Sequence, residues 1–283
     1  MRDQTTFNTP LPEILDGPMG TALLAAGYGG LPLIANLKNP SLVKQIYSSY
    51  LESGSTIITT NTFLANSFWI NTHYPELNVE ALIESAVQLA RESMSGFHAK
   101  LWGNISPSGL SMKQWDTLSA GHRFSLFSDP IKKLKELDIQ DLFLESFFNR
   151  EEIAYALDAA NSVYDGDKIT LSLIFENQSL KDGTSLIDVL HILKQYSFKA
   201  VGINCVEQFS ETAIIFEKIA INLNTPMLFE PNAEAIQGLK DEKILNVLDH
   251  LYETGVRYFG GCCGTDRRWI EQLVLWRDSY IQD

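Results

Sequence analysis

Three cysteines carry the clearest chemical signal in this sequence of 283 residues. Cys262 and Cys263 are adjacent within a glycine-rich run, GGCCG, and Cys205 ends an apolar run much earlier in the chain. Three is an odd number and too few for a disulfide framework, and a reducing compartment would keep all three as thiols. Packing, redox chemistry and metal binding are the roles open to them.

Three thiolates directed at one point suit a zinc ion, and a site with only three protein ligands leaves the fourth position for a substrate. Gly260, Gly261 and Gly264 would let the backbone turn tightly enough for both neighbouring sulfurs to face one metal. A buried cysteine can also be a small hydrophobe, and for Cys205 in isolation that explanation is equally good. A strained disulfide between the adjacent pair is a further alternative with a rare geometry.

Short apolar, β-branched runs alternate with amphipathic segments along the chain. The expected strands are residues 13–17, 55–63, 100–106, 142–146, 168–175, 200–205, 226–232 and 257–263. The expected helices are residues 39–54, 78–96, 124–137, 149–163, 185–196, 210–221, 241–253 and a last one from 266. Pro130 is expected to interrupt the third helix, and residues 107–122 to form a long loop.

This alternation requires a parallel sheet with crossover helices, and eight units close naturally into a barrel. We therefore predict an α/β protein, a (β/α)8 TIM barrel that forms a single domain over residues 1–283. A doubly wound open sheet is the structural alternative.

The functional groups of such a barrel lie at the C-terminal ends of its strands, because the loops that follow them meet on one rim. Most of the expected strands end in polar residues, cysteine or glycine. These residues are Asp16, Gly17, Asn61, Asn104, Ser106, Glu145, Cys205, Glu230, Asn232, Cys262 and Cys263. The cysteines come from the sixth and eighth strands, which are one strand apart, so their thiolates can reach one point. This position favours the metal hypothesis. Asp16 alone would be explained as a turn residue or helix cap, but its strand-end position favours a site role.

Two acidic side chains at strand ends need a positively charged partner. Glu145 follows an apolar strand, and because an unpaired buried carboxylate is costly, we expect a ligand ammonium beside it. Glu230 could instead form a salt bridge within the barrel. The five histidines, His73, His98, His122, His191 and His250, fall mainly in expected loops or helices, where solvated or structural roles are favoured.

Six segments resemble, in this order, the homocysteine S-methyltransferase family: LDGPMGT, ITTNTF, LFLES, GINC, EPNA and GGCCGTD. The resemblance covers nearly the whole chain. It implies a zinc-dependent (β/α)8 barrel that moves a methyl group to the thiol of homocysteine, in methionine biosynthesis. It also implies that Cys205, Cys262 and Cys263 bind zinc and form the catalytic centre.

The resemblance implies roles for six further residues. Asp16, Gly17 and Glu145 match homocysteine-binding positions, with carboxylates that hold the substrate ammonium. Thr60 and Asn61 match a motif that lines the pocket. Asn232 matches an asparagine that, in some members, fills the fourth zinc position until substrate displaces it. With zinc bound, the substrate thiol would lose its proton, so no general base is expected.

The chain departs from the family pattern at two motifs, and its segment between the third and fourth strands is also unusual, on a face that commonly helps to receive the methyl donor. The chain has SPSG at residues 106–109, where the family usually has a glycine-proline pair often followed by tyrosine, and Glu145-Ser146 where Glu-Thr or a similar pair is usual. A stand-alone unit of this length most resembles members that use a sulfonium donor, S-methylmethionine or S-adenosylmethionine. A methyltransferase for another small thiol or selenol is an alternative, as is a non-catalytic zinc and thiol binder that serves as a sensor or subunit.

Composition and charge exclude other classes of partner. The net charge is −13 and the 22 basic residues are scattered, so nucleic acid is not an expected partner. No apolar run reaches the length of a signal peptide or of a membrane span, so we expect no membrane contact and a cytoplasmic location. Hydrophobic residues make up 45% of the chain, enough for a substantial core.

Overall fold

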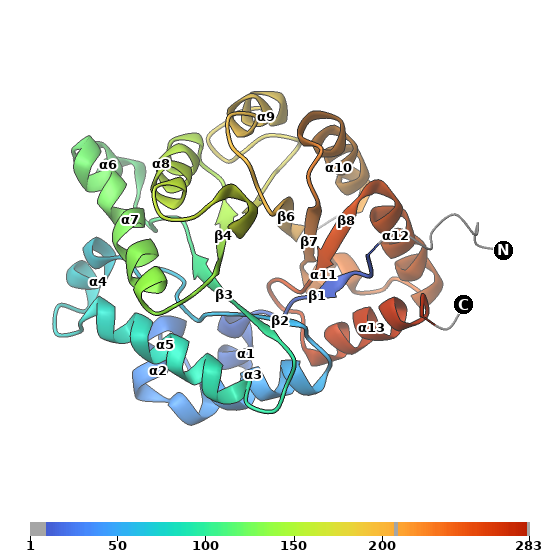
Figure 1. The fold of residues 1–283 in the computed structure, drawn as a ribbon, viewed down its shortest axis with the longest axis horizontal. Helices are drawn as coiled ribbons and strands as arrows, with labels where there is room; N and C mark the ends of the chain where they lie inside the picture. The colour runs from blue at the N-terminus through green and yellow to red at the C-terminus, as the bar shows by residue number, and fades with distance from the viewer. Residues whose placement is uncertain (1–9, 207–208, 282–283) are drawn as a thin grey trace.

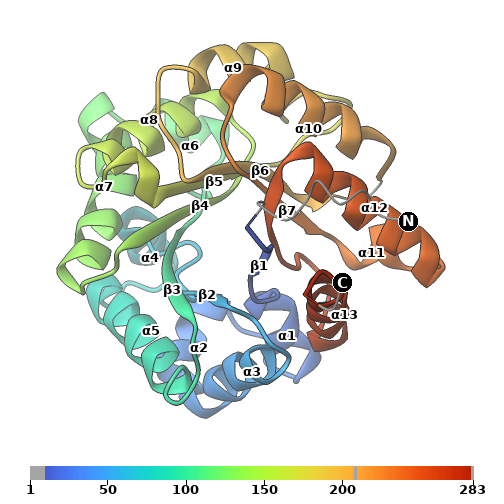
Figure 2. The same ribbon diagram turned by 45° about the vertical axis from the view of Figure 1, so that its right-hand side comes forward.

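Eight parallel strands form one sheet in the order β1-β8-β7-β6-β5-β4-β3-β2 in the computed structural model, which describes residues 10–206 and 209–281. A parallel bridge between Leu15 and Ile57 joins the two outer strands, so the sheet closes on itself. Helices surround the strands on the outside (Figures 1 and 2). The predicted (β/α)8 barrel is confirmed, and the open doubly wound sheet is wrong.

The strands are β1 (Glu13–Ile14), β2 (Ile57–Thr59), β3 (Lys100–Ile105), β4 (Asp141–Phe147), β5 (Ile169–Leu173), β6 (Ala200–Val206), β7 (Met227–Pro231) and β8 (Val256–Phe259). The helices that match the predicted ones are α3 (Pro40–Glu52), α5 (Val79–Ser93), α7 (Ala120–Glu136), α8 (Arg150–Asn161), α9 (Leu186–Leu193), α10 (Phe209–Leu223), α12 (Asp241–Thr254) and α13 (Arg267–Asp278). Shorter helices not predicted are α1 (Met19–Ala25), α2 (Pro32–Lys38), α4 (Ser67–His73), α6 (Met112–Asp116), α11 (Ala233–Ile236) and the 3-10 turn η2 (Gly166–Lys168).

Local capping explains most helix starts. Asn78, Asn149 and Ser185 precede α5, α8 and α9, and each side chain accepts a backbone N–H from the first turn. Asn39 stands at the predicted N-cap of α3, but its side chain makes no capping hydrogen bond, and Pro40 begins the helix.

Two expectations around α7 are wrong. Residues 107–122 are not one long loop, because Ser111 forms a capping box that starts α6 and Ser119 accepts from the His122 N–H at the start of α7. Pro130 does not interrupt α7, which runs unbroken through it. Leu126 and Leu134 lie on the buried face of this helix, so packing against the barrel offsets the hydrogen bond that proline removes.

The barrel interior has an apolar floor beneath a polar layer. The floor is a separate cluster made by Leu15, Ile57, Trp102, Phe143 and Leu228, against which Tyr258 packs. Side chains two residues apart on a strand face the same side. The next inward positions are therefore Thr59, Asn104, Glu145 and Glu230, which form a polar layer toward the C-terminal ends of the strands.

The larger core lies between the sheet and the helices, and it holds most of the buried aliphatic and aromatic side chains. In the part of the chain that the structure describes, every helix is too short or too polar to cross a membrane.

Candidate active site

A cavity of about 620 Å³ opens at the C-terminal ends of the strands. Eight of the nine predicted site residues line it: Asp16, Gly17, Thr60, Asn61, Glu145, Cys205, Cys262 and Cys263. The ninth, Asn232, is not among the lining residues. Because the strand ends lie on one rim of the barrel, residues more than two hundred positions apart in the sequence meet in this cavity.

The three cysteines converge within this cavity. Their sulfur atoms all lie within 4.8 Å of one another, and the Sγ atoms of Cys205 and Cys263 are 3.9 Å apart. The structure joins Cys205 to Cys262 as a disulfide and leaves Cys263 outside it, which differs from the expectation of three thiols. The disulfide considered from the sequence, between the adjacent pair, is not the one observed. Three sulfurs grouped in this way could hold a metal ion.

Cys205 reaches the site through an irregularity in β6. The pairing of β6 with β7 shifts register between Asn204 and Val206, and Cys205 adopts a left-handed backbone conformation with φ +54°. In a regular strand, neighbouring side chains point to opposite faces. The bulge turns the Cys205 sulfur toward the same site as the inward-facing Asn204.

The glycines around Cys262 and Cys263 act mainly through close packing. Only Gly264 has the positive φ, +79°, that the predicted tight turn requires. A Cβ atom on Gly260 would lie 2.8 Å from Glu230 Oε1, and one on Gly261 would lie 2.3 Å from Thr265 Oγ1. Gly264 therefore has the left-handed conformation that favours glycine, and Gly260 and Gly261 allow close approach of neighbouring side chains.

Asp16 is buried and held by one partner. Its carboxylate accepts hydrogen bonds from the Thr59 backbone N–H at 3.0 Å and from the Thr59 hydroxyl at 3.2 Å. Burial raises the pKa of Asp16 to about 8, and the charge of Glu145 adds to the rise, whereas the Thr59 hydrogen bonds oppose it.

Two further carboxyl groups line the cavity. The Asn104 amide donates to Glu145, and burial raises the pKa of Glu145. Burial also raises the pKa of Glu230 well above its ordinary value, as do the charges of Glu145 and Asp16, and Glu230 Oε2 has no hydrogen-bond partner. Sequence reasoning noted Glu230 at a strand end, but the salt bridge considered for it is absent among the described residues.

No lysine, arginine or histidine is among the described residues that line this cavity. Three buried carboxyl groups without a basic partner favour a ligand that carries positive charge. The same surroundings affect Cys263, because partial burial and the charge of Glu145 raise the pKa of its thiol. A cation placed among these groups would favour their ionised forms.

Thr60 and Asn61 form part of the cavity wall and are already hydrogen-bonded within the protein. The Thr60 hydroxyl lies 2.7 Å from that of Thr62, and it accepts from the Asn104 N–H at 2.9 Å. The Asn61 amide donates to Pro32 O at 2.7 Å and to a neighbouring side-chain oxygen. Their contact with substrate stays a prediction.

Asn232 follows β7 and occupies the N-cap position of α11, without a side-chain capping bond. Its backbone N–H donates to Val206 O at 2.9 Å, and its buried Oδ1 has no hydrogen-bond partner in the described ranges of the chain. Its role as a fourth metal ligand also stays a prediction.

A sequence model described as "Homocysteine S-methyltransferase" matches residues 13–275, which is most of the chain. The chain belongs to the homocysteine S-methyltransferase family. It is similar to Homocysteine S-methyltransferase 2 of Saccharomyces cerevisiae, with 23% identity over 92% of each chain. It is also similar to Betaine--homocysteine S-methyltransferase 1 of Xenopus tropicalis, with 23% identity over 88% of this chain and 68% of that protein.

Solved structures agree on the fold of this homocysteine S-methyltransferase family member. The metallated form of the homocysteine methyltransferase MmuM from Escherichia coli superposes with a TM-score of 0.78 at 22% identity, over 95% of this chain and 98% of that one. The oxidised form of the same protein gives a TM-score of 0.77 at 21% identity, over 93% and 95%.

Part of the cavity wall is apolar, and sequence reasoning missed it. It is lined by Met19, Leu24, Tyr28, Leu31, Phe63, Leu64, Phe148 and Ile174. These residues follow the strand ends or belong to α1 and the segment after it. Their nearness to strand ends was an available signal, but apolar residues at such positions look the same in sequence whether they line a cavity or fill a core.

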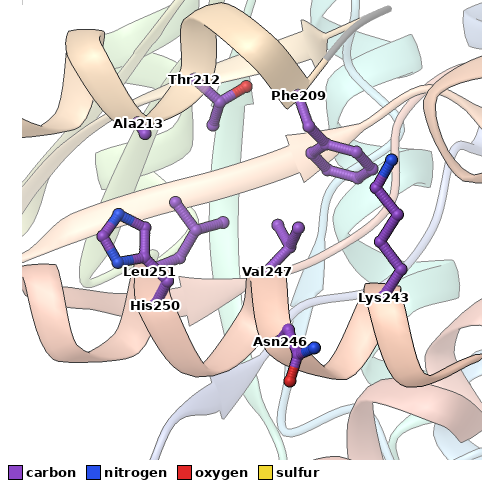
Figure 3. Close-up of a pocket in the computed structure, with 8 residues that line it drawn as sticks. All are labelled: Phe209, Thr212, Ala213, Lys243, Asn246, Val247, His250 and Leu251. Atoms are coloured by element: carbon purple, nitrogen blue, oxygen red, sulfur yellow. The ribbon is translucent and has the colours of Figure 1, made fainter.

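A second, smaller groove of about 190 Å³ lies on the outside of the barrel between α10 and α12 (Figure 3). Phe209, Val247 and Leu251 line it together with polar residues that include Lys243 and His250. It contains neither a cysteine nor a carboxylate, so the site chemistry belongs to the cavity at the strand ends.

Proposed function

We propose that this chain is a zinc-dependent methyltransferase that moves a methyl group from a sulfonium donor, S-methylmethionine or S-adenosylmethionine, to the thiol of homocysteine and so forms methionine. Membership of the family supports the acceptor. The observation that carries the proposal is the group of three cysteine sulfurs within 4.8 Å of one another, in a cavity that also holds three carboxyl groups. We assign this function to the barrel as one domain, predicted over residues 1–283, and to the cytoplasm, where thiols stay reduced.

The donor set fits zinc. Cys205, Cys262 and Cys263 would supply three thiolates, the ligand type that zinc prefers, and a site with three protein ligands leaves a position for substrate. When bound, zinc supplies a Lewis acid that lowers the pKa of a coordinated thiol. The proposal that Asn232 holds the fourth position before substrate arrives rests on the family pattern alone.

The carboxyl groups would bind and orient homocysteine. Asp16 and Glu145 lie in the same cavity as the sulfurs and lack a basic partner there. The ammonium group of homocysteine would compensate their negative charge and leave its thiol directed at the cysteines. Gly17 lines the cavity and lets the Tyr50 ring pack closely behind it, since a Cβ atom there would lie 2.7 Å from that ring. Thr60 and Asn61 would complete the wall.

The charge of the cavity supports a cationic donor. A carboxylate-lined cavity with no described basic residue favours a sulfonium over an anionic methyl carrier. In the reaction, the homocysteine sulfur would form a bond to the methyl carbon as the donor carbon–sulfur bond breaks. The electron pair of that bond stays on the donor sulfur, and the thiol proton leaves to solvent. The apolar side that includes Tyr28 and Phe63 would exclude water from the transferred methyl group.

The proposal is tested by metal analysis of the reduced protein and by a panel of methyl donors. We expect about one zinc ion per chain, and methionine from homocysteine with S-methylmethionine or S-adenosylmethionine but not with betaine. Metal-replete protein that forms no methionine with either sulfonium would refute the proposal. Methylation of another thiol, or tight homocysteine binding without turnover, would identify the alternative functions.

Two cysteine variants separate metal binding from a redox pair. Cys205→Ser and Cys263→Ser should each lose most of the zinc, because each removes one of three thiolates. If the Cys205 and Cys262 sulfurs served only as a disulfide, Cys263→Ser would leave the metal content unchanged. Zinc measured by atomic absorption after dialysis distinguishes the two.

A further inference from the structure

We propose that Asn204 is a positioning residue for the metal centre: its amide donates hydrogen bonds to the ligand sulfurs, and a serine pair on neighbouring strands holds that amide in place. The inference rests on the proposed function, because it concerns how the three cysteines bind zinc. It adds a residue that neither the strand-end pattern nor the family resemblance assigned.

The Asn204 side chain is buried beside two of the cysteine sulfurs. It is 1% exposed, and its Nδ2 atom is 3.7 Å from Cys262 Sγ and 3.9 Å from Cys205 Sγ. The same Nδ2 donates to Ser146 Oγ at 2.5 Å. Because an amide nitrogen carries two hydrogens, one can serve the serine while the other is directed at the sulfurs.

Ser146 is placed for this contact by a bulge in β4. The pairing of β4 with β5 shifts register between Leu144 and Phe147, and Ser146 adopts a left-handed conformation with φ +66°. Its backbone N–H donates to Ser172 Oγ on β5 at 3.1 Å. Ser172 is fully buried, so the contact is shielded from water.

These contacts form a continuous chain from Ser172 through Ser146 and Asn204 to the sulfurs of Cys205 and Cys262. This series of hydrogen bonds connects β5, β4, β6 and the loop after β8. It joins the two bulges that hold non-glycine residues at positive φ, Ser146 and Cys205. Such conformations are unfavourable for residues with a side chain and persist only where surrounding contacts enforce them.

The chemical consequence concerns negative charge. Three thiolates brought within a few ångströms repel one another, and an N–H donor directed at sulfur reduces that repulsion. Hydrogen-bond partners of metal ligands commonly change metal affinity by about 10- to 100-fold when they are removed. Asn204 would therefore favour the three-thiolate arrangement and moderate the charge on the sulfurs.

The test measures zinc affinity of the reduced full-length protein by competition with a chelator, together with the absorption spectrum of the cobalt(II)-substituted protein. Asn204→Ala should weaken zinc binding by about 10- to 100-fold and shift the sulfur-to-cobalt charge-transfer bands. Asn204→Asp should weaken it further, because it removes the donor and adds negative charge. Ser146→Ala should weaken it less, since it releases the amide without removing it.

Asn66→Ala is the matched control. Asn66 is also buried, at 4% exposed, and its amide donates to Ser108 O while its Oδ1 caps α4. This variant should lower the melting temperature but leave zinc affinity and the cobalt spectrum unchanged.

Three results are decisive. Zinc affinity and cobalt spectra of Asn204→Ala that equal those of the wild type would overturn this inference while leaving the proposed function intact. A wild-type protein that binds no zinc would overturn the proposed function and the inference with it. If Asn204→Ala fails to fold, Ser146→Ala decides, and unchanged zinc affinity in that variant overturns the inference.

Discussion

Asp16 illustrates how a carboxyl group changes its properties with its position in the fold. At the end of β1 it is 5% exposed and bonded to Thr59, and burial raises its pKa to about 8. An unfolded chain would release this proton near pH 4. Between these pH values the folded protein holds a proton on Asp16 that the unfolded chain has lost, so the contribution of this group to stability decreases as the pH rises through that range.

Asp16→Asn should therefore be more stable than the wild type, by a difference that grows by up to about 1.4 kcal/mol per pH unit between about pH 5 and pH 8. The same change should raise the KM for homocysteine, because the ammonium loses an anionic partner. Urea unfolding of the substrate-free proteins across this range, with steady-state kinetics, measures both effects. Asp167→Asn, at an exposed position, should follow the wild-type curve. A difference in unfolding free energy between Asp16→Asn and the wild type that stays constant with pH would contradict the prediction.

The strands of this barrel position the site through their irregularities as much as through their regular pairing. The bulges at Ser146 and Cys205 turn consecutive residues toward the cavity. Close strand contact elsewhere depends on the absence of a side chain. At Gly202 on β6, an added Cβ atom would lie 1.9 Å from the Leu228 carbonyl oxygen on β7.

Gly202→Ala should destabilise the protein by about 3 kcal/mol or more, because backbone atoms of a paired strand cannot move aside as a flexible side chain can. Gly29→Ala is the matched control, since a Cβ atom there meets nothing within 4 Å, and its effect on stability should be small. Denaturant midpoints of the two variants provide the comparison. Equal stability of both variants would show that β6 and β7 separate without cost.

At the scale of the whole molecule, barrel closure makes the cavity a meeting point for distant segments. The sulfurs come from β6 and the loop after β8, and the carboxyl groups come from the ends of β1, β4 and β7. A ligand that bridges these segments binds only the folded chain, so it should raise the free energy of unfolding by mass action.

Zinc at about one hundred times its dissociation constant should stabilise the reduced protein by about 2.7 kcal/mol, and a strong chelator should remove this gain. Thermal melts with zinc and with chelator, both with a reductant present, measure the difference. The melting temperature of Cys205→Ser should not respond to either treatment. A response equal to that of the wild type would indicate that zinc stabilises the fold from another place.

Much of this protein could be predicted from its sequence because the relevant interactions are local or periodic. The alternation of apolar runs with amphipathic segments predicted the barrel. The position of Asp16, Glu145 and Cys205 at strand ends predicted that they share one rim. Helix starts such as Asn149 follow from a side chain and the N–H groups beside it. Expectations were wrong at Pro130, where packing against the barrel outweighs a local preference.

Only the tertiary structure decided which side chains actually meet. The left-handed conformations of Ser146 and Cys205 arise from strand pairing, and no local pattern marks a serine or cysteine for them. The burial of Glu230 Oε2 without a hydrogen-bond partner and the contact of Asn204 with two sulfurs likewise depend on segments far apart in the chain. Sequence periodicity determines on which face of a strand a residue lies, whereas distances across the barrel depend on how all eight strands close.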